Sequence, residues 1–275
     1  MLRDLLVLVG SGGQAEAVGD FAIQIAAPWL ARVSVFGVPR DPGQLMYLAQ
    51  APAKALAEAL RQAQLDAEAS AKRVRDRAEL AAVDCSHHVI VAPAQDVPAV
   101  VSRLARRFDL CVMSLPSPES GSDDGKLFEA ALLGGGRPVL GVPNGATGLS
   151  APSRVLIAWD GTREASRAVA DALPFLRRAS LVEIVCVGGA TEAVDQDYPG
   201  CDVASHLSRH GIACEFLRLP ATAVVASQLL NRAGEMQADM IVMGGYHHSQ
   251  WREAILGGTT RAMSRASKIP ILMSR

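Results

Sequence analysis

The sequence has no excess charge of either sign and no paired cysteines. Its 27 Lys and Arg residues nearly balance its 28 Asp and Glu residues, which leaves a formal net charge of −1. A near-neutral chain is not expected to bind nucleic acid or a membrane surface by general electrostatic attraction. The five cysteines are odd in number and form no CxxC pair, so neither a disulfide framework nor a zinc ribbon is predicted.

The sequence also has no hydrophobic run of membrane-spanning length. The first apolar run, LLVLV at 5–9, is far below the roughly 18 residues that a span needs, and it is too short for a signal peptide. Scattered cysteines without partners are typical of small buried residues in a reducing compartment. We therefore expect no membrane segment and a cytoplasmic location.

Two segments of the 275-residue chain are alike, and this suggests an internal repeat. The apolar runs at 5–9 and 155–159 each end in a turn of small residues, Gly10-Ser11-Gly12 in one case and Asp160-Gly161-Thr162 in the other. Each turn leads into an Ala-rich stretch with helical spacing. Short continuous apolar runs are typical of strands that are buried on both faces, so each copy is predicted to open with a parallel strand and a helix.

The two halves also end alike. Each closes with a proline followed by a short apolar strand, RPVLGV at 137–142 and IPILM at 269–273, and a further apolar strand precedes each. Strands alternating with helices predict a doubly wound parallel sheet in each half. Because the stretch between the halves is rich in Gly, Ser and Pro, we expect domains at 1–143 and 154–275, joined by a linker at 144–153.

Three passages of the second half resemble the universal stress protein family: VLIAWDGTREASRAVADAL at 155–173, ADMIVMGGYHHSQWREAILGGTTRAM at 238–263, and the terminal strand. The resemblance is close over 154–275 and loose over 1–142. It implies an α/β fold of two tandem doubly wound five-stranded parallel-sheet domains, of the adenine nucleotide α-hydrolase-like type. It also implies that strands 138–142 and 270–274 lie antiparallel in an intramolecular pseudo-dimer, and a further homodimer stays open.

The same resemblance implies an adenine nucleotide site, for ATP or a related nucleotide, in the second domain only. In the family, a glycine loop after the fourth strand meets the phosphates, an acidic residue meets the ribose, and a residue at the end of the second strand meets the base. Carried over to this chain, Asp160 would face the ribose, with Val187 and Gly244 beside the base. The remaining site positions are His247, Gly257, Gly258 and Thr259.

The chain departs from the family's loop pattern. His247 replaces a glycine, and Gly258 replaces a hydroxyl residue, although Thr259 follows directly. The imidazole of His247 can coordinate a ligand, donate to phosphate, or fill a disused pocket, and these three alternatives stay open. In the first half, Gly10 stands where Asp160 stands in the second, and Asp123 would repel phosphate, as would its neighbour Asp124. The first copy is therefore expected not to bind ATP in the family's manner.

Other patterns point to different chemistry less specifically. Gly10 to Ala15 fits a dinucleotide fingerprint with Asp41 downstream, but a tight turn into the first helix, parallel to Asp160-Gly161-Thr162 in the second copy, is the favoured interpretation. His206 and His210 share a helix face, but no third ligand completes a metal site. No motif places a catalytic triad, so no catalytic residue and no metal are assigned.

These observations favour a stress-response binding or regulatory protein that senses ATP or another adenine nucleotide in its C-terminal domain. Two alternatives stay open: a nucleotide-independent interaction module with both pockets degenerate, and an enzyme. The enzyme would be a weak ATPase or a dinucleotide-dependent protein. Enzyme activity is thus uncertain, with slow ATP hydrolysis as its upper limit.

The histidine in the glycine loop gives a first prediction. A side chain where the family has glycine crowds the loop, and a positive φ there would cost on the order of 1 kcal/mol. We therefore expect His247→Gly to bind ATP more tightly than the wild type, and Asp160→Ala to bind it more weakly, in calorimetric titrations. If His247→Gly binds no better, the histidine contacts the ligand and the crowding interpretation is wrong.

Overall fold

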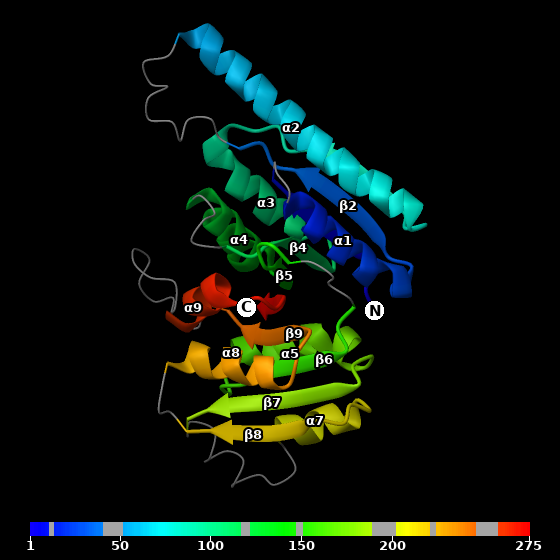
Figure 1. Ribbon diagram of the computed structural model, residues 1–275, viewed down its shortest axis with the longest axis vertical. Helices are drawn as coiled ribbons and strands as arrows, with labels where there is room; N and C mark the ends of the chain where they lie inside the picture. The colour runs from blue at the N-terminus through cyan, green and yellow to red at the C-terminus, as the bar shows by residue number, and fades with distance from the viewer. Residues whose placement is uncertain are drawn as a thin grey trace. The chain divides into compact units, whose positions relative to one another are not determined.

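The computed structural model describes residues 1–10, 14–40, 52–116, 122–146, 151–188, 202–220, 224–245 and 258–275. The chain forms two compact units (Figure 1). The first unit contains Met1–Ser114 and the segment that holds the helix before Arg137. The second contains Pro138–Pro143 and the chain from Ser150 to Arg275.

The first unit alternates strands and helices. In chain order its strands and α-helices are β1 (Asp4–Val9), α1 (Gln14–Ala26), β2 (Arg32–Gly37), α2 (Ala53–Leu80), β3 (Cys85–Val89), α3 (Val97–Ala105), β4 (Leu110–Ser114) and α4 (Ser122–Gly135). Short 3₁₀ turns at Ala27–Trp29 and Ala94–Asp96 interrupt the connections. Helix α2 is 28 residues long and runs past the end of β2 (Figure 1).

The sheet of the first unit is parallel, in the order β3-β2-β1-β4. Residues Leu5 to Val9 of β1 are all buried, which explains why this strand is a continuous apolar run rather than an alternating one. Helix α1 packs against α2, and α3 packs against α4. Right-handed crossovers place the first pair on one face of the sheet and the second pair on the other.

The second unit repeats the alternation. Its elements are β5 (Val139–Val142), β6 (Arg154–Ala158), α5 (Arg163–Leu176), β7 (Leu181–Val187), α7 (Val203–Arg209), β8 (Glu215–Leu219), α8 (Val225–Glu235), β9 (Met240–Gly244), α9 (Gly258–Ala266) and β10 (Ile271–Ser274). Its parallel strands run in the order β10-β9-β6-β7-β8. Strand β5 lies antiparallel to β10, with Leu140 opposite Leu272.

These elements confirm the predicted fold class. Each half of the described sequence supplies five strands, and the sheets are parallel except where β5 meets β10. The expected antiparallel pairing of segments 138–142 and 270–274 is present as the β5–β10 pair. Among the described residues, no helix combines the length and the hydropathy that crossing a bilayer would require.

An aspartate at the start of one strand makes the same contact in both units. In the first unit, Asp109 Oδ2 accepts hydrogen bonds from the backbone N–H groups of Arg3 and Asp4, at 2.8 and 3.2 Å. In the second, Asp239 Oδ2 accepts from the N–H groups of Ser153 and Arg154, at 3.0 and 2.8 Å. Each carboxylate fixes the entry of the unit's first central strand, so the internal repeat extends to side-chain contacts.

A buried ion pair joins a helix of the second unit to its sheet. Glu183 lies on β7 and is 2% exposed. Its two carboxylate oxygens accept hydrogen bonds from Nε and a terminal nitrogen of Arg232 on α8, at 2.7 and 2.5 Å. These bonds, followed by a weaker contribution from Glu235, raise the pKa of Arg232 above its usual value. The pair therefore holds α8 against the sheet, because a carboxylate buried without a partner is costly.

We expect Arg232→Ala to destabilise the protein by about 3 kcal/mol, because it leaves the Glu183 carboxylate buried and unpaired. Thermal melting of the full chain measures the effect. The matched control is Arg167→Ala, which removes an exposed i,i+4 pair with Asp171 on α5 and is expected to cost less than about 1 kcal/mol. Equal effects of the two substitutions would contradict a structural role for the buried pair.

Candidate functional site

The second unit has a topological switch point between β6 and β9. The chain leaves β6 toward β7 on one side, and it returns to β9 on the other side. In open parallel sheets, ligands bind at such a point, outside the carboxyl ends of the strands. The pairs Ala158–Val185 and Ala158–Met243 bring the carboxyl ends of β6, β7 and β9 to one edge. This edge of the sheet is the candidate site.

The turn after β6 positions Asp160. Gly161 has a φ of +74°, a conformation that glycine adopts without strain, and it folds the chain back on itself. As a result, both the backbone N–H and the hydroxyl of Thr162 donate to Asp160 Oδ1, at 3.1 and 2.6 Å. Asp160 is exposed to solvent at the carboxyl end of β6. The turn therefore presents a fixed carboxylate at the edge of the sheet.

Gly244 allows β9 to lie against the first turn of α5. A Cβ atom at this position would lie 2.6 Å from the backbone nitrogen of Ala165 and 2.8 Å from the carbonyl carbon of Glu164. That nitrogen donates in turn to Thr162 Oγ1, at 3.2 Å. Gly244, the α5 N-terminus and Asp160 are thus linked through consecutive contacts, and the structure brings these two predicted site residues together.

The other described site positions lie at the same edge. Val187 ends β7, two residues past Val185, which pairs with the last residue of β6, Ala158. Helix α9 begins at Gly258 and connects β9 to β10. A helix that joins two parallel strands runs back along the sheet, so Gly258 and Thr259 start at the carboxyl edge. The predicted residues His247 and Gly257 lie outside the described residues.

Glu164 is a further acidic residue at this edge that the sequence pattern did not predict as a site residue. This residue in the first turn of α5 is 1% exposed, and its Oε1 accepts a hydrogen bond from Arg163 Nε at 2.5 Å. A carboxylate in the first turn of a helix is stabilised by the helix dipole. The signal in the sequence was an acidic residue two positions after a Thr N-cap. Its burial depends on β9 lying close above it, which the pattern does not show.

The first unit differs at the corresponding edge. Gly10 follows β1, where Asp160 follows β6, so this unit has no carboxylate in the equivalent position. Of the dinucleotide fingerprint, Ser11 to Gly13 and Asp41 lie outside the described residues. Asp123 is in the first turn of α4, but its side chain is also outside them.

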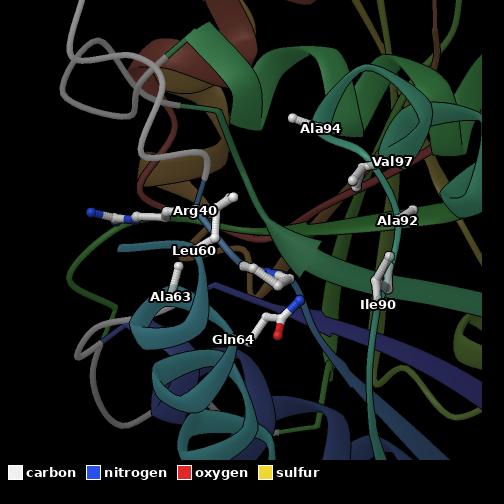
Figure 2. A pocket seen from close by; sticks show the side chains of 9 residues that line it. Arg40, Leu60, Ala63, Gln64, Ile90, Ala92, Ala94 and Val97 are labelled. Atoms are coloured by element: carbon white, nitrogen blue, oxygen red, sulfur yellow. The ribbon is translucent and has the colours of Figure 1, made fainter. Parts of the chain in front are cut away.

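The first unit does have a small apolar pocket near the carboxyl ends of β2 and β3 (Figure 2). Its volume of about 50 Å³ is well below that of a typical ligand site. The Arg40 side chain points away from the other lining residues in Figure 2. The lining is otherwise apolar except for Gln64, and consists of Pro39, Arg40, Leu60, Ala63, Gln64, Ile90, Ala92, Ala94 and Val97. The pocket is too small to accommodate a nucleotide.

The cysteines and histidines do not form a second site in the described part of the chain. Burial raises the pKa of the Cys85 thiol to about 11 and that of Cys111 to about 12, so neither is a reactive thiolate. The ring centroids of His206 and His210 lie 4.7 Å apart. A terminal guanidinium nitrogen of Arg177 lies 3.1 Å from His210 Nδ1. No group of three or more ligating side chains occurs among the described residues.

Solved structures resemble the chain over nearly its whole length. A universal stress protein from Archaeoglobus fulgidus DSM 4304 matches with a TM-score of 0.67 and 17% identity, covering 98% of both chains. A functionally unknown protein from Pseudomonas aeruginosa PAO1 matches with a TM-score of 0.62 and 13% identity, covering 99% of this chain and 92% of its own. No protein-family model and no curated protein matches the sequence.

A further comparison concerns a shorter protein. The universal stress protein from Archaeoglobus fulgidus in complex with dAMP covers 43% of this chain and 94% of its own. Its identity is 21% and its TM-score is 0.33, a likeness too partial to carry an argument. The switch-point topology places both units in the doubly wound α/β class. The full-length matches then show that the chain has the universal stress protein fold, as the sequence resemblance implied.

The close approach at Gly244 generates a prediction about stability. Gly244→Ala would place a methyl group against the backbone of Glu164 and Ala165, which cannot move without displacing α5. We expect a loss of roughly 1–3 kcal/mol. Gly234→Ala is the matched control, because it lies in α8 with open space around its Cβ position. It is expected to be neutral or stabilising in thermal melts. If Gly244→Ala has a melting temperature equal to or above that of Gly234→Ala, the close contact between Gly244 and α5 is refuted.

Proposed function

We propose that the second unit binds ATP or a related adenine nucleotide at the carboxyl edge of β6, β7 and β9. On this proposal the protein is a stress-response binding or regulatory protein with one nucleotide site per chain. The site lies in the predicted C-terminal domain, after the predicted linker at 144–153. On the same proposal, the first domain, predicted to comprise 1–143, does not bind the nucleotide in this way, because Gly10 stands where the second has Asp160.

The observation that carries the proposal is the convergence of three separate segments at the switch point. Asp160 is exposed and fixed by Thr162, Gly244 brings β9 against the start of α5, and Val187 ends the neighbouring strand. A carboxylate accepts hydrogen bonds from ribose hydroxyls. The ends of β7 and β9 flank that carboxylate, which is where the base would be held.

The start of α9 supplies the phosphate end of the proposed site. Its first turn contains no acidic residue, and Gly258 has open space around its Cβ position. Free backbone N–H groups and the helix dipole at such a terminus favour an anion. Gly258 and Thr259 would donate to the phosphates, and the sequence adds Gly257 and His247 to this part of the site.

The proposal predicts both the number of ATP molecules bound per chain and a contact between Asp160 and the ribose. In calorimetric titrations of the full chain with ATP, we expect one site per chain. Asp160→Asn should weaken binding roughly tenfold, because the charge-assisted hydrogen bond to the ribose becomes a neutral one. Asp171→Asn is the control, because it removes the same charge from the outer part of α5, where Asp171 pairs with Arg167.

Three results would contradict the proposal. Failure of the wild-type protein to bind ATP would favour the nucleotide-independent interaction module. Two sites per chain, or equal affinities of Asp160→Asn and wild type, would place the nucleotide somewhere other than the edge of the second sheet.

A further inference from the structure

The hydrogen bonds around Asp160 determine how much of its carboxylate a ligand can use. Oδ1 accepts from both the N–H and the hydroxyl of Thr162, at 3.1 and 2.6 Å. A carboxylate oxygen offers about two lone-pair directions, so these two bonds occupy Oδ1. Among the described residues, none donates a hydrogen bond to Oδ2 of Asp160. The carboxylate therefore presents one oxygen, not two, to a ligand.

Thr162 is itself held in place, so this arrangement is fixed before any ligand arrives. Thr162 is the N-cap of α5, and its Oγ1 accepts a hydrogen bond from the Ala165 N–H at 3.2 Å. Because Oγ1 uses a lone pair to accept this bond, the hydroxyl proton of Thr162 is directed at Asp160. The first turn of α5 is in turn pressed against Gly244. Rotating the carboxylate away would break both bonds from Thr162.

The neighbouring charges leave Oδ2 available to a ligand. Arg163 directly follows Thr162 in the chain, but its Nε donates a hydrogen bond to the buried Glu164 rather than to Asp160. Arg167, one turn further along α5, is paired with Asp171. The nearest described cations on this helix are thus directed to other carboxylates, and Asp160 keeps its charge for a hydrogen-bond donor from the ligand.

We propose that the site recognises its nucleotide through a single ribose hydroxyl, because Thr162 occupies the second carboxylate oxygen of Asp160. This inference rests on the proposed function. A carboxylate with both oxygens open can take the 2′ and 3′ hydroxyls one to each oxygen. Here the contact of one hydroxyl with each oxygen is blocked, and the two lone pairs of Oδ2 diverge too widely for two adjacent ribose hydroxyls to align with both. The class of ligand therefore includes nucleotides that lack one of the two hydroxyls. Thr162 is a positioning residue, since it acts through Asp160.

The experiment compares ATP with 2′-deoxy-ATP, 3′-deoxy-ATP and 2′,3′-dideoxy-ATP by calorimetry on the full wild-type chain. We expect one monodeoxy analogue to bind within about threefold of ATP, and the other to bind about tenfold more weakly. The dideoxy analogue should match the weaker one. Weakening by both monodeoxy analogues would show a two-point contact and overturn the inference, as would equal binding of all four ligands.

Two substitutions test the role of Thr162. Thr162→Val removes the hydroxyl bond and keeps the backbone N–H bond, so one lone-pair direction of Oδ1 becomes open to a ligand. A second ribose hydroxyl can then donate to Oδ1, and both monodeoxy analogues should bind about tenfold more weakly than ATP. Thr162→Ser keeps both hydroxyl contacts and should preserve the wild-type pattern. A merely structural N-cap would lower the melting temperature without changing the order of the ligands, so an unchanged order in Thr162→Val would also overturn the inference.

Different results would refute the proposed function and the single-hydroxyl inference. If the wild-type chain binds none of the four ligands, the proposed function falls, and the single-hydroxyl inference falls with it. If ATP binds at one site and Asp160→Asn weakens it, the proposed function stands, and the pattern among the deoxy analogues alone decides the inference. The wild-type ligand series decides it even if Thr162→Val does not fold.

Discussion

The candidate site depends on one steric constraint, the contact between the end of β9 and the first turn of α5. Gly244 leaves no room for a side chain above the Ala165 nitrogen, so strand and helix backbones meet directly. That nitrogen is also the donor that orients Thr162, and Thr162 orients Asp160. A bulkier residue at Gly244 would displace the helix end, and with it the carboxylate. The packing of β9 against α5 and the orientation of the Asp160 carboxylate therefore depend on each other.

In the described part of the second unit, several carboxylates are already engaged by partners within the fold. Glu183 is neutralised by Arg232 within the fold, and Glu164 is buried beside Arg163. Asp239 is used by backbone N–H groups at the opposite edge of the sheet. Asp160 differs because it is exposed and its partners are a hydroxyl and an amide, which leave its charge in place. A carboxylate fixed by neutral donors is suited to accept hydrogen bonds from a neutral polyol such as ribose.

Much of the fold could be predicted from sequence because its signals are local. Continuous apolar runs such as LLVLV and VLIAW identify buried parallel strands, and repeated strand ends show the tandem order. The antiparallel meeting of β5 with β10 is not a local signal and came from the family resemblance. The buried pair of Glu183 and Arg232 could not be predicted, because the two residues are 49 positions apart in the chain and nothing in either segment marks the other.

The same distinction explains which parts of the site the sequence anticipated. Asp160 and Gly244 stand at strand ends, so a strand assignment alone brings them to one edge. The role of Thr162 was hidden because Asp-Gly-Thr is equally consistent with a simple turn into a helix. Only the positive φ of Gly161 lets the threonine hydroxyl return to the carboxylate while its oxygen caps the helix. The first unit has Gly10 in place of Asp160, so the repeat there keeps the strand and the helix without a carboxylate for a threonine to orient. The two copies thus differ in the residue that follows their first strand, Gly10 in one and Asp160 in the other, while both keep the parallel sheet that presents it.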